Sequence, residues 1–307
     1  MQIEFQENIS MKNYTSFKVG GIAKIVYFPK DKEELIKLLM NNPNAIVLGN
    51  CSNTIVSSNG IDEELIITTK MNNYSFVDTK ITADCGVRGP FISQKAQEQG
   101  LSGFEFMIGF PGTIGGMVYM NAGAHNQETA ASFVEAEVFD RKSKKILKLT
   151  KKEMEFSYRK SVLAEKDYVV LNAVFELQKQ EQAVIDEIMQ RNLEFRKLRQ
   201  PTLSLPNAGS TFKNPANDSA GRLLDLAGAK GLKVGGAKVW DNHANFIVNE
   251  GNATSEDILN LMYKMYNIVK EKYTIELKSE LKYLGKMTKE EEEIWQTITK
   301  DMAKTQG

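Results

Sequence analysis

The chain has 307 residues, 42% of them hydrophobic and 25% charged, which is the composition of an ordinary globular protein. Lys plus Arg and Asp plus Glu both number 39, and this zero net charge argues against a general nucleic-acid-binding protein, which carries a basic surplus. The sequence has no apolar run near the ~20 residues of a membrane helix and no secretory signal in its opening residues. We therefore expect a cytoplasmic protein of two or three compact units, with no nucleic-acid partner and no membrane insertion.

Cysteine and histidine are scarce in this sequence. The two cysteines, Cys51 and Cys85, form neither a CxxC pair nor a disulfide framework, so we interpret them as reduced thiols. The two histidines, His125 and His243, are interpreted as structural residues. Because these four residues do not match a ligand pattern for a transition metal, we expect no metal site.

The first half of the sequence mixes strands and helices. Four segments have the apolar or alternating pattern of strands, namely residues 24–29, 45–49, 64–69 and 80–86. A helix is predicted over residues 31–40, with Asp31 as its N-cap and Glu34 three residues later. A second helix is expected to start near Pro90 and to end at Gly100.

Three further strands and a long helix precede a predicted domain boundary. The strands cover residues 134–140, 145–150 and 168–177, and their short spacing predicts an antiparallel meander. The helix runs over residues 182–199 and is followed by Pro201. We expect its inner face to carry Ile185, Ile188, Met189 and Leu193.

The last part of the chain predicts another α+β unit. Short strands are expected around residues 210–214, 245–249 and 275–285. The helix over 254–273 begins with a Thr254–Asp257 capping box and has a core face of Ile258, Met262, Met265 and Val269. After Gly285 a second capping box, Thr288–Glu291, predicts an amphipathic helix with Ile294, Trp295, Ile298 and Met302, which packs on its own protein or, as the alternative, on a partner.

Two glycine-rich stretches are candidates for a phosphate-bearing ligand. Residues 48–56, LGNCSNTIV, follow an apolar strand and have the turn residues that form an anion nest. Residues 109–124, GFPGTIGGMVYMNAGA, combine bare backbone with apolar flanks, which a flexible linker lacks. Neither stretch matches the GxGxxG or GxxxxGK[ST] pattern. Each alone could be a tight turn, but together they favour a ligand that carries a diphosphate.

Seven motifs occur in an order that resembles the UDP-N-acetylenolpyruvoylglucosamine reductases. They are TSFKVGG, LGNCSN, GFEFMIGFPGTIGGMVYMNAGA, SYRKS, NAGSTFKNP, GGAKVWDNHANFIVN and SELKYLG, and the similarity runs from about residue 13 to residue 285. The compact passage between residues 158 and 207 is similar to the shorter type of this family, which lacks an extra substrate-covering loop. The resemblance implies an α+β fold with an FAD-binding unit of the vanillyl-alcohol-oxidase (PCMH) type. Its subdomains would be residues 1–70 and 71–199, followed by a substrate domain over 200–285 and a tail over 286–307.

The resemblance also implies the ligands and the reaction. FAD would be held noncovalently, NADPH would donate hydride, and UDP-N-acetylglucosamine enolpyruvate would be reduced to UDP-N-acetylmuramate by a protein that we expect to be a monomer. The flavin and its diphosphate would lie against Gly49, Asn50, Cys51, Ser52, Asn53, Gly109, Pro111, Gly112, Thr113, Gly115, Gly116, Asn121, Ala122 and Gly123.

Three positions match the catalytic residues of the family. Arg159 would hold the substrate carboxylate through its planar fork, Ser210 would protonate the carbanion, and Glu280 would polarise the carboxylate or act as a proton partner. The substrate would also be bound by Tyr158, Lys213 and Asn214. By spacing alone each of these residues could be an ordinary surface or core residue.

The sequence departs from the family pattern at a few points. Cys51 stands where the family usually has glycine, and if that turn needs a positive φ the cysteine costs roughly 1 kcal/mol. Ile22 replaces a usual proline, Trp240 and Asp241 replace small and basic residues, and SELK replaces PEVR around Glu280. Two alternatives therefore stay open, namely another flavoenzyme of this fold, such as an oxidase, and a flavin- or nucleotide-binding protein without turnover.

Overall fold

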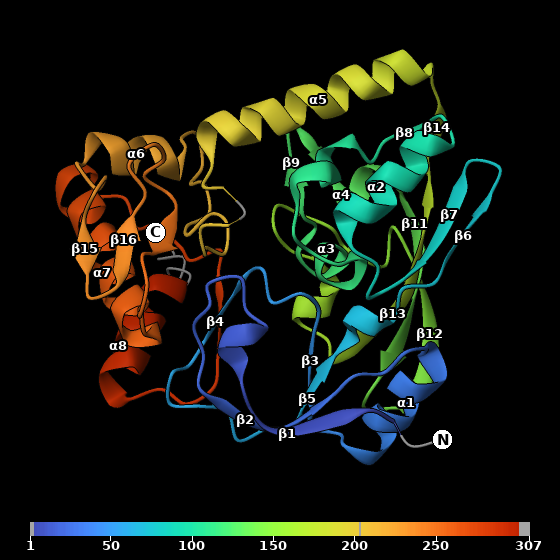
Figure 1. Cartoon of the computed structure of the whole chain (residues 1–307), viewed down its shortest axis with the longest axis horizontal. Coiled ribbons are helices and arrows are strands. Elements are labelled where there is room, and N and C mark those ends of the chain that lie inside the picture. Colours follow the sequence, from blue (N-terminus) through green and yellow to red (C-terminus); the bar gives the residue numbers. More distant parts are fainter. Residues whose placement is uncertain (1–2, 203, 301–307) are drawn as a thin grey trace, which may run out of the picture. The chain divides into compact units, whose positions relative to one another are not determined.

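The computed structural model describes residues 3–202 and 204–300, which divide into two compact units (Figure 1). The first unit comprises residues 3–7, 25–50 and 63–198. The second comprises residues 8–24, 51–62 and 199–300. Each unit has its own hydrophobic core, so the mixed order of helices and strands in the sequence corresponds to two α+β units.

The first unit is built on a five-stranded antiparallel sheet of order β12-β11-β13-β7-β6. Its strands are β6 (Tyr74–Val77), β7 (Lys80–Asp84), β11 (Phe133–Asp140), β12 (Lys145–Thr150) and β13 (Tyr168–Glu176). The predicted meander is wrong in its order, because β13 pairs with β11 and not with β12. The long segment between β12 and β13 lets the chain return to the other edge of β11.

A second sheet in the N-terminal part has the order β1-β2-β5-β3. Its strands are β1 (Phe5–Ser10), β2 (Ile22–Tyr27), β3 (Ile46–Leu48) and β5 (Leu65–Ile67), and β5 pairs in parallel with both of its neighbours. The short strands β8 (Leu101–Ser102) and β14 (Gln178–Lys179) form one further pair, and β9 (Gly123–Ala124) and β10 (Gln127–Glu128) form another.

The helices of the first unit are α1 (Lys32–Asn41), α2 (Gly89–Glu98), α3 (Ile114–Met120), α4 (Thr129–Ser132) and α5 (Gln182–Arg199), with 3-10 turns at Thr68–Lys70, Glu105–Gly109 and Val162–Ala164. The side chain of Asp31 accepts from the Glu34 amide at 2.9 Å, which confirms the predicted cap of α1. Pro90 lies in the first turn of α2, as predicted.

The inner face of α5 is narrower than the sequence suggested. Ile185 and Met189 are buried against Ile108, but Leu193 is 44% exposed, so its predicted place on this face is wrong. At about 100° per residue, Leu193 points roughly 80° away from Ile185. Asn192 takes the inner position instead, and its Nδ2 donates to the carbonyl oxygen of Glu105 at 3.1 Å.

The second unit combines a three-stranded antiparallel sheet with helices. The sheet contains β15 (Lys233–Val234), β16 (Ala237–Val239) and β17 (Ile247–Asn249), and the helices are α6 (Ala220–Leu226), α7 (Ser255–Tyr273) and α8 (Lys289–Thr299), with a 3-10 turn at Met11–Asn13. A separate parallel pair joins β4 (Thr54–Val56) to β18 (Lys282–Leu284). Both predicted capping boxes are present, on α7 and α8. Ile294 and Ile298 of α8 are buried in the core of this unit, whereas Met302 lies outside the described residues.

Candidate active site

The first unit places two of the predicted cofactor segments together at the end of β3. Gly49 follows β3 directly, and Asn50 donates from Nδ2 to the carbonyl oxygen of Pro111 at 2.6 Å. A Cβ on Gly49 would overlap Thr113 Oγ1, so glycine is what allows these two segments to approach so closely. Residues 49–50 and 111–113, which are distant in the sequence, are therefore neighbours in the fold.

Thr113 has a buried hydroxyl that no other side chain or backbone group satisfies. The residue is 1% exposed, and its Oγ1 has no hydrogen-bond partner within the part of the chain that the structure describes. Leaving such a group unpaired costs about 1–3 kcal/mol, so buried hydroxyls normally have a partner. Gly116 lies beside it, and a Cβ there would meet no atom closer than 3.8 Å. An unpaired hydroxyl next to bare backbone fits a ligand with phosphate oxygens, so these residues suit the expected FAD.

The remaining residues of the glycine-rich stretch are fixed by contacts within the first unit. A Cβ would come within 3.0 Å of Arg196 at Gly109, within 3.0 Å of Cys85 at Gly115 and within 2.5 Å of the Gln127 carbonyl oxygen at Gly123. The carbonyl of Gly112 accepts from the Gly89 amide at 3.0 Å, and the amide of Ala122 donates to the Met117 carbonyl at 2.9 Å. The protein's own packing thus defines the path of this stretch.

Asn121 joins the glycine-rich stretch to the turn that carries Arg159. It ends α3 with a φ of +42° and is fully buried. Its Nδ2 donates to the Ser157 carbonyl at 3.0 Å, and its Oδ1 accepts from the Ala130 amide at 3.0 Å. On the other side of the turn, Ser161 Oγ donates to the Tyr119 carbonyl at 2.8 Å. The turn is therefore attached at both ends.

Tyr158 and Arg159 occupy the tip of this turn. Ser157 and Lys160 exchange two backbone hydrogen bonds around them, and Arg159 has a φ of +56°. The guanidinium group of Arg159 lies 5.1 Å from the centre of the Tyr158 ring, and its Nη2 donates to the Gly123 carbonyl at 2.8 Å. This contact connects a predicted catalytic residue to the end of the predicted cofactor stretch.

The second unit contains the other part of the LGNCSN motif, Cys51, Ser52 and Asn53, in a turn that leads into β4. Cys51 is 5% exposed and has a φ of +46°. Because the turn does need a positive φ here, a residue with a Cβ strains the backbone at this position. Burial raises the pKa of the Cys51 thiol to about 12. The cysteine is therefore a packing residue of this turn and not an ionised nucleophile.

The segments with Ser210 and Glu280 are adjacent in the second unit. The amide of Glu280 donates to the Thr211 carbonyl at 2.9 Å, and Phe212 forms an antiparallel bridge with Ser279. Asn53 donates from Nδ2 to the Glu280 carbonyl at 3.0 Å. The segments that carry the predicted proton donor, the predicted carboxylate and the predicted cofactor turn are therefore hydrogen bonded to one another.

Asn245 is a positioning residue that the sequence reasoning missed. Its Oδ1 accepts from the Phe212 amide at 2.9 Å and its Nδ2 donates to the Phe212 carbonyl at 2.8 Å. The carboxamide thus replaces a backbone partner, which is why residues 210–214 form isolated bridges and not the strand that we predicted. Asn245 belongs to the NFIVN motif, but apolar periodicity does not predict a side chain that forms the hydrogen bonds of a neighbouring strand.

Two lysines lie near each other close to Glu280. Desolvation by burial, and to a smaller extent the charge of Lys213, lowers the pKa of Lys282. Lys282 follows Glu280 by two residues and begins β18. Asn214, the other predicted substrate residue, accepts through Oδ1 from the Ala220 amide at 3.0 Å, at the start of α6.

Comparison with known proteins decides the family. The chain matches the models of an "FAD binding domain" over residues 23–150 and of "UDP-N-acetylenolpyruvoylglucosamine reductase, C-terminal domain" over residues 200–284. The UDP-N-acetylenolpyruvoylglucosamine reductases of Caldicellulosiruptor bescii and Clostridium novyi are 42% and 40% identical to it, over 92% of this chain and over 91% and 92% of the respective relative. The chain belongs to the UDP-N-acetylenolpyruvoylglucosamine reductase family.

A solved structure of the same family has a similar fold. The crystal structure of the Thermus caldophilus reductase matches with a TM-score of 0.79 at 33% identity, over 92% of this chain and 99% of that chain. The expected α+β fold with an FAD-binding unit is therefore confirmed. The protein is an FAD-dependent oxidoreductase of peptidoglycan precursor synthesis. The C-terminal family model ends at residue 284, so α8 lies beyond it.

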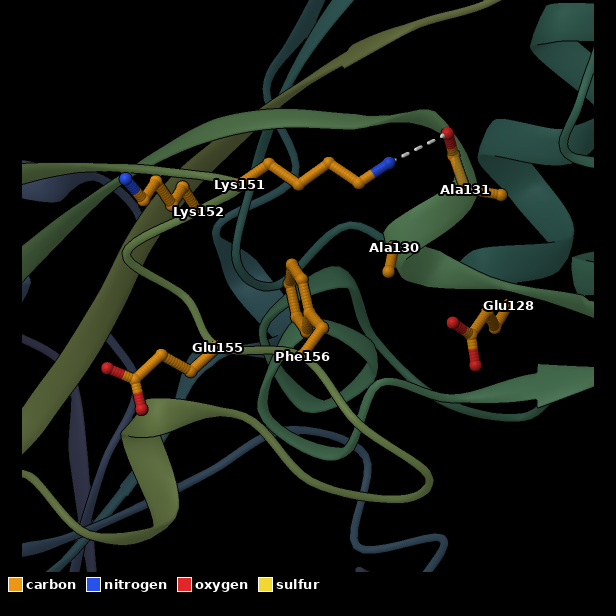
Figure 2. Close-up of a pocket in the computed structure, with 7 residues that line it drawn as sticks. All are labelled: Glu128, Ala130, Ala131, Lys151, Lys152, Glu155 and Phe156. Atoms are coloured by element: carbon orange, nitrogen blue, oxygen red, sulfur yellow. Dashed lines mark hydrogen bonds between the residues drawn. The ribbon is translucent and has the colours of Figure 1, made fainter.

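A separate pocket of about 370 Å³ lies in the first unit (Figure 2). It is lined by Glu128, Ala130, Ala131, Lys151, Lys152, Glu155 and Phe156, and Lys151 Nζ donates to the Ala131 carbonyl at 3.4 Å. None of the predicted site residues lines it. Its two lysines and two glutamates balance each other in charge, so the pocket gives no clear preference for an anion or a cation.

The remaining titratable candidates fit structural roles. Burial lowers the pKa of His243, and its Nδ1 accepts from the Asn245 amide at 3.2 Å. Burial and the charge of Arg191 lower the pKa of His125, which packs edge-on against Phe195. In the described ranges there is no group of three or more His, Cys, Asp or Glu residues that could hold a metal ion, and no helix is long and apolar enough to cross a membrane.

Proposed function

We propose that this member of the family catalyses the NADPH-dependent reduction of UDP-N-acetylglucosamine enolpyruvate to UDP-N-acetylmuramate. The observation that carries the proposal is the meeting of the Ser210, Glu280 and Asn53 segments in the second unit, through the hydrogen bonds from the Glu280 amide and from Asn53 Nδ2. Bound FAD supplies the hydride, which it receives from NADPH. The residues of the chain bind the substrate, stabilise the negative charge that develops on it and donate a proton to it.

Arg159 binds the substrate carboxylate in this proposal. Hydride addition to the methylene carbon places negative charge on the adjacent carbon and on its carboxylate. A guanidinium fork stabilises this charge with two parallel hydrogen bonds, which a lysine cannot provide. The attachment of the turn to Gly123 and Asn121 fixes the orientation of Arg159 before the substrate arrives.

Ser210 Oγ gives a proton to the carbon next to the carboxylate, and Glu280 polarises that carboxylate. A serine hydroxyl is a weak acid, so it needs positive charge nearby to be competent. Lys213 and Lys282 are the candidates for that charge, since each lies within two or three residues of Ser210 or Glu280. Tyr158, Lys213 and Asn214 bind the sugar nucleotide in this proposal.

The residues proposed for FAD are Gly49, Asn50 and the glycine-rich stretch in the first unit, and Cys51, Ser52 and Asn53 in the second unit. Thr113 Oγ1 and the backbone at Gly116 are the groups best suited to the phosphates, because the Thr113 hydroxyl has no hydrogen-bond partner among the described residues and a Cβ on Gly116 would meet no atom closer than 3.8 Å. Within the chain, residues 1–70 and 71–199 form the FAD-binding subdomains, residues 200–285 the substrate domain and residues 286–307 the tail. The protein acts as a monomer in the cytoplasm.

The test is an anaerobic assay of the FAD-loaded protein. NADPH oxidation beyond one equivalent per flavin, only when the enolpyruvyl nucleotide is present, is the expected result. In a parallel run with air admitted, reduced flavin that oxygen reoxidises faster than the nucleotide does would replace the proposal with a flavin oxidase. Flavin that is reduced and never reoxidised would point to a binding protein or to another acceptor.

The role of Ser210 is tested by Ser210→Ala with Ser204→Ala as the matched control. Ser204 is exposed, and its hydroxyl shares a hydrogen bond with that of Thr202 in the same unit. We expect Ser210→Ala to keep reduction of the flavin by NADPH and to lose at least about 100-fold in reduction of the nucleotide, as is typical of a general acid. Unchanged turnover in Ser210→Ala would show that another group gives the proton.

A further inference from the structure

The buried carboxylate of Glu291 is the most unusual feature of α8. Glu291 is 2% exposed, although it belongs to the first turn of a helix at the end of the described chain. Its Oε2 accepts from the Thr288 amide at 2.8 Å and so completes the capping box. Its Oε1 faces inward and accepts from Tyr283 Oη at 3.1 Å and from Ser255 Oγ at 3.4 Å. A helix cap alone would need neither the burial nor these two partners.

Ser255 connects Glu291 to the segment that follows β4. Ser255 and Ser58 exchange two hydrogen bonds, each from a backbone amide to the other hydroxyl and each of 2.9 Å. The neighbouring residue Ser57 donates from its amide to the Leu284 carbonyl at 2.8 Å and from its hydroxyl to the Lys286 carbonyl at 2.5 Å. The chain directly before α8 therefore holds the C-terminal end of the β4 segment.

Tyr283 connects Glu291 to the N-terminal end of the same segment. Tyr283 lies in β18 opposite Ile55 of β4. One residue earlier, the Lys282 amide donates to the Asn53 carbonyl at 3.0 Å, and Asn53 returns a bond to the Glu280 carbonyl. At the other end of α8, the Ile298 carbonyl accepts from the Ser279 amide at 2.8 Å. β18 and the segment that precedes it are thus both hydrogen bonded to α8.

We propose that Glu291 is a positioning residue for the cofactor, which holds the Cys51–Asn53 turn in its binding conformation through Tyr283 and Ser255. The inference rests on the proposed role of that turn in FAD binding. It assigns a task to a helix that lies outside the C-terminal family model. Because the strained φ of Cys51 disfavours the turn by itself, the turn needs support from its neighbours.

The test compares Glu291→Ala with Glu292→Ala in the full-length protein. Glu292 is exposed. Its substitution by alanine removes the same charge from the same helical turn, so Glu292→Ala controls for the effect on the helix dipole. Two quantities are measured, the dissociation constant of FAD by flavin fluorescence and the amide hydrogen exchange of residues 51–58 in the FAD-free protein. We expect Glu291→Ala to bind FAD about tenfold more weakly and to exchange faster in this segment, and Glu292→Ala to match the unmodified protein.

Two further variants keep the test decisive. Glu291→Gln retains an acceptor oxygen for Tyr283 and Ser255, so it should recover most of the FAD affinity. Tyr283→Phe removes only the hydroxyl that reaches Glu291, and it should weaken FAD binding in the same direction even if Glu291→Ala does not fold. Unchanged FAD affinity in the folded variants would overturn the inference, whether or not hydrogen exchange is faster. No measurement here uses the enolpyruvyl nucleotide, so a protein that binds FAD without reducing this substrate would refute the proposed function alone.

Discussion

Because Cys51 has a left-handed backbone conformation, we expect glycine at this position to give a more stable protein than alanine, which is the reverse of the usual order. At most positions glycine is less stable than alanine by about 0.5–1 kcal/mol, because it loses more backbone freedom on folding. At a φ of +46°, however, a residue with a Cβ pays roughly 1–2 kcal/mol that glycine does not. The difference predicts that Cys51→Gly is more stable than Cys51→Ala by about 1 kcal/mol.

The same energy contributions predict the stability of each Cys51 variant relative to the unmodified protein. Removing the buried sulfur costs close to the value of one methylene group, about 0.8 kcal/mol. Cys51→Ala should therefore be destabilised by about that amount. In Cys51→Gly the relieved strain offsets both the lost sulfur and the added chain entropy, so its stability should stay near that of the unmodified protein. Cys51→Val, with a β-branched side chain at positive φ, should be the least stable of the three.

Urea unfolding followed by tryptophan fluorescence suits this comparison. The two tryptophans, Trp240 and Trp295, both belong to the second unit, as does Cys51, so the signal reports on the unit that is perturbed. The measurement is made without FAD, since ligand binding would add its own stabilisation. If Cys51→Ala proves more stable than Cys51→Gly, the ordinary order holds and the argument from backbone strain is refuted.

Three other outcomes are expected. Asn245→Ala leaves the Phe212 amide and carbonyl without their partner, so urea unfolding should show a loss of about 2–3 kcal/mol; a loss below half that value would mean that water replaces the carboxamide. Because burial lowers the pKa of His243, the unfolded chain binds its proton more readily, and the stability that is fully present above pH ~6.5 should fall as the pH drops through the folded pKa. His243→Asn, which keeps an acceptor near the Asn245 amide, should show a smaller loss of melting temperature between pH 7 and pH 5 than the unmodified protein, and an equal loss would assign the effect elsewhere. Since burial raises the pKa of Cys51 and of Cys85 to about 12, Ellman's reagent at pH 8 should label neither thiol in the native protein and both in urea; rapid labelling of the native protein would contradict their burial.

Local sequence signals predicted the elements whose causes are local. The caps of α1, α7 and α8 depend on residues three positions apart, and all three are present. The core face of α7 follows from its 3.6-residue period, and Ile258, Met262, Met265 and Val269 are fully buried. Such features need no knowledge of the rest of the fold.

Features that depend on distant partners were missed. The order of β11, β12 and β13 is decided by which edge the returning chain selects, and periodicity carries no information about that choice. The parallel pair of β4 and β18 joins segments from opposite ends of the chain. The burial of Glu291 and the bonds of Asn245 are polar contacts across the fold, and the local sequence around either residue does not predict them.

The candidate site could be predicted from the motifs, because the resemblance to a family assigns residues that are distant in the sequence to one site. Ser210 and Glu280 lie 70 residues apart, yet the two segments are hydrogen bonded in the second unit. Nothing in their local spacing predicts this, whereas the resemblance to a family predicts it at once. The local capping box predicted α8, but the burial of Glu291 and its bonds to Tyr283 and Ser255 are seen only in the packing of the second unit.

The long separation between β4 and β18 has a consequence for biosynthesis. Asn53 leaves the ribosome 227 residues before its partner Glu280. At 5–20 residues per second, this delay amounts to roughly 10–45 seconds. During that time β4 lacks its pairing strand, and the core of the second unit lacks α7 and α8. Because such long-range pairings close slowly, the second unit completes its folding only after β18 and α8 have been synthesised, while most of the first unit can already be folded.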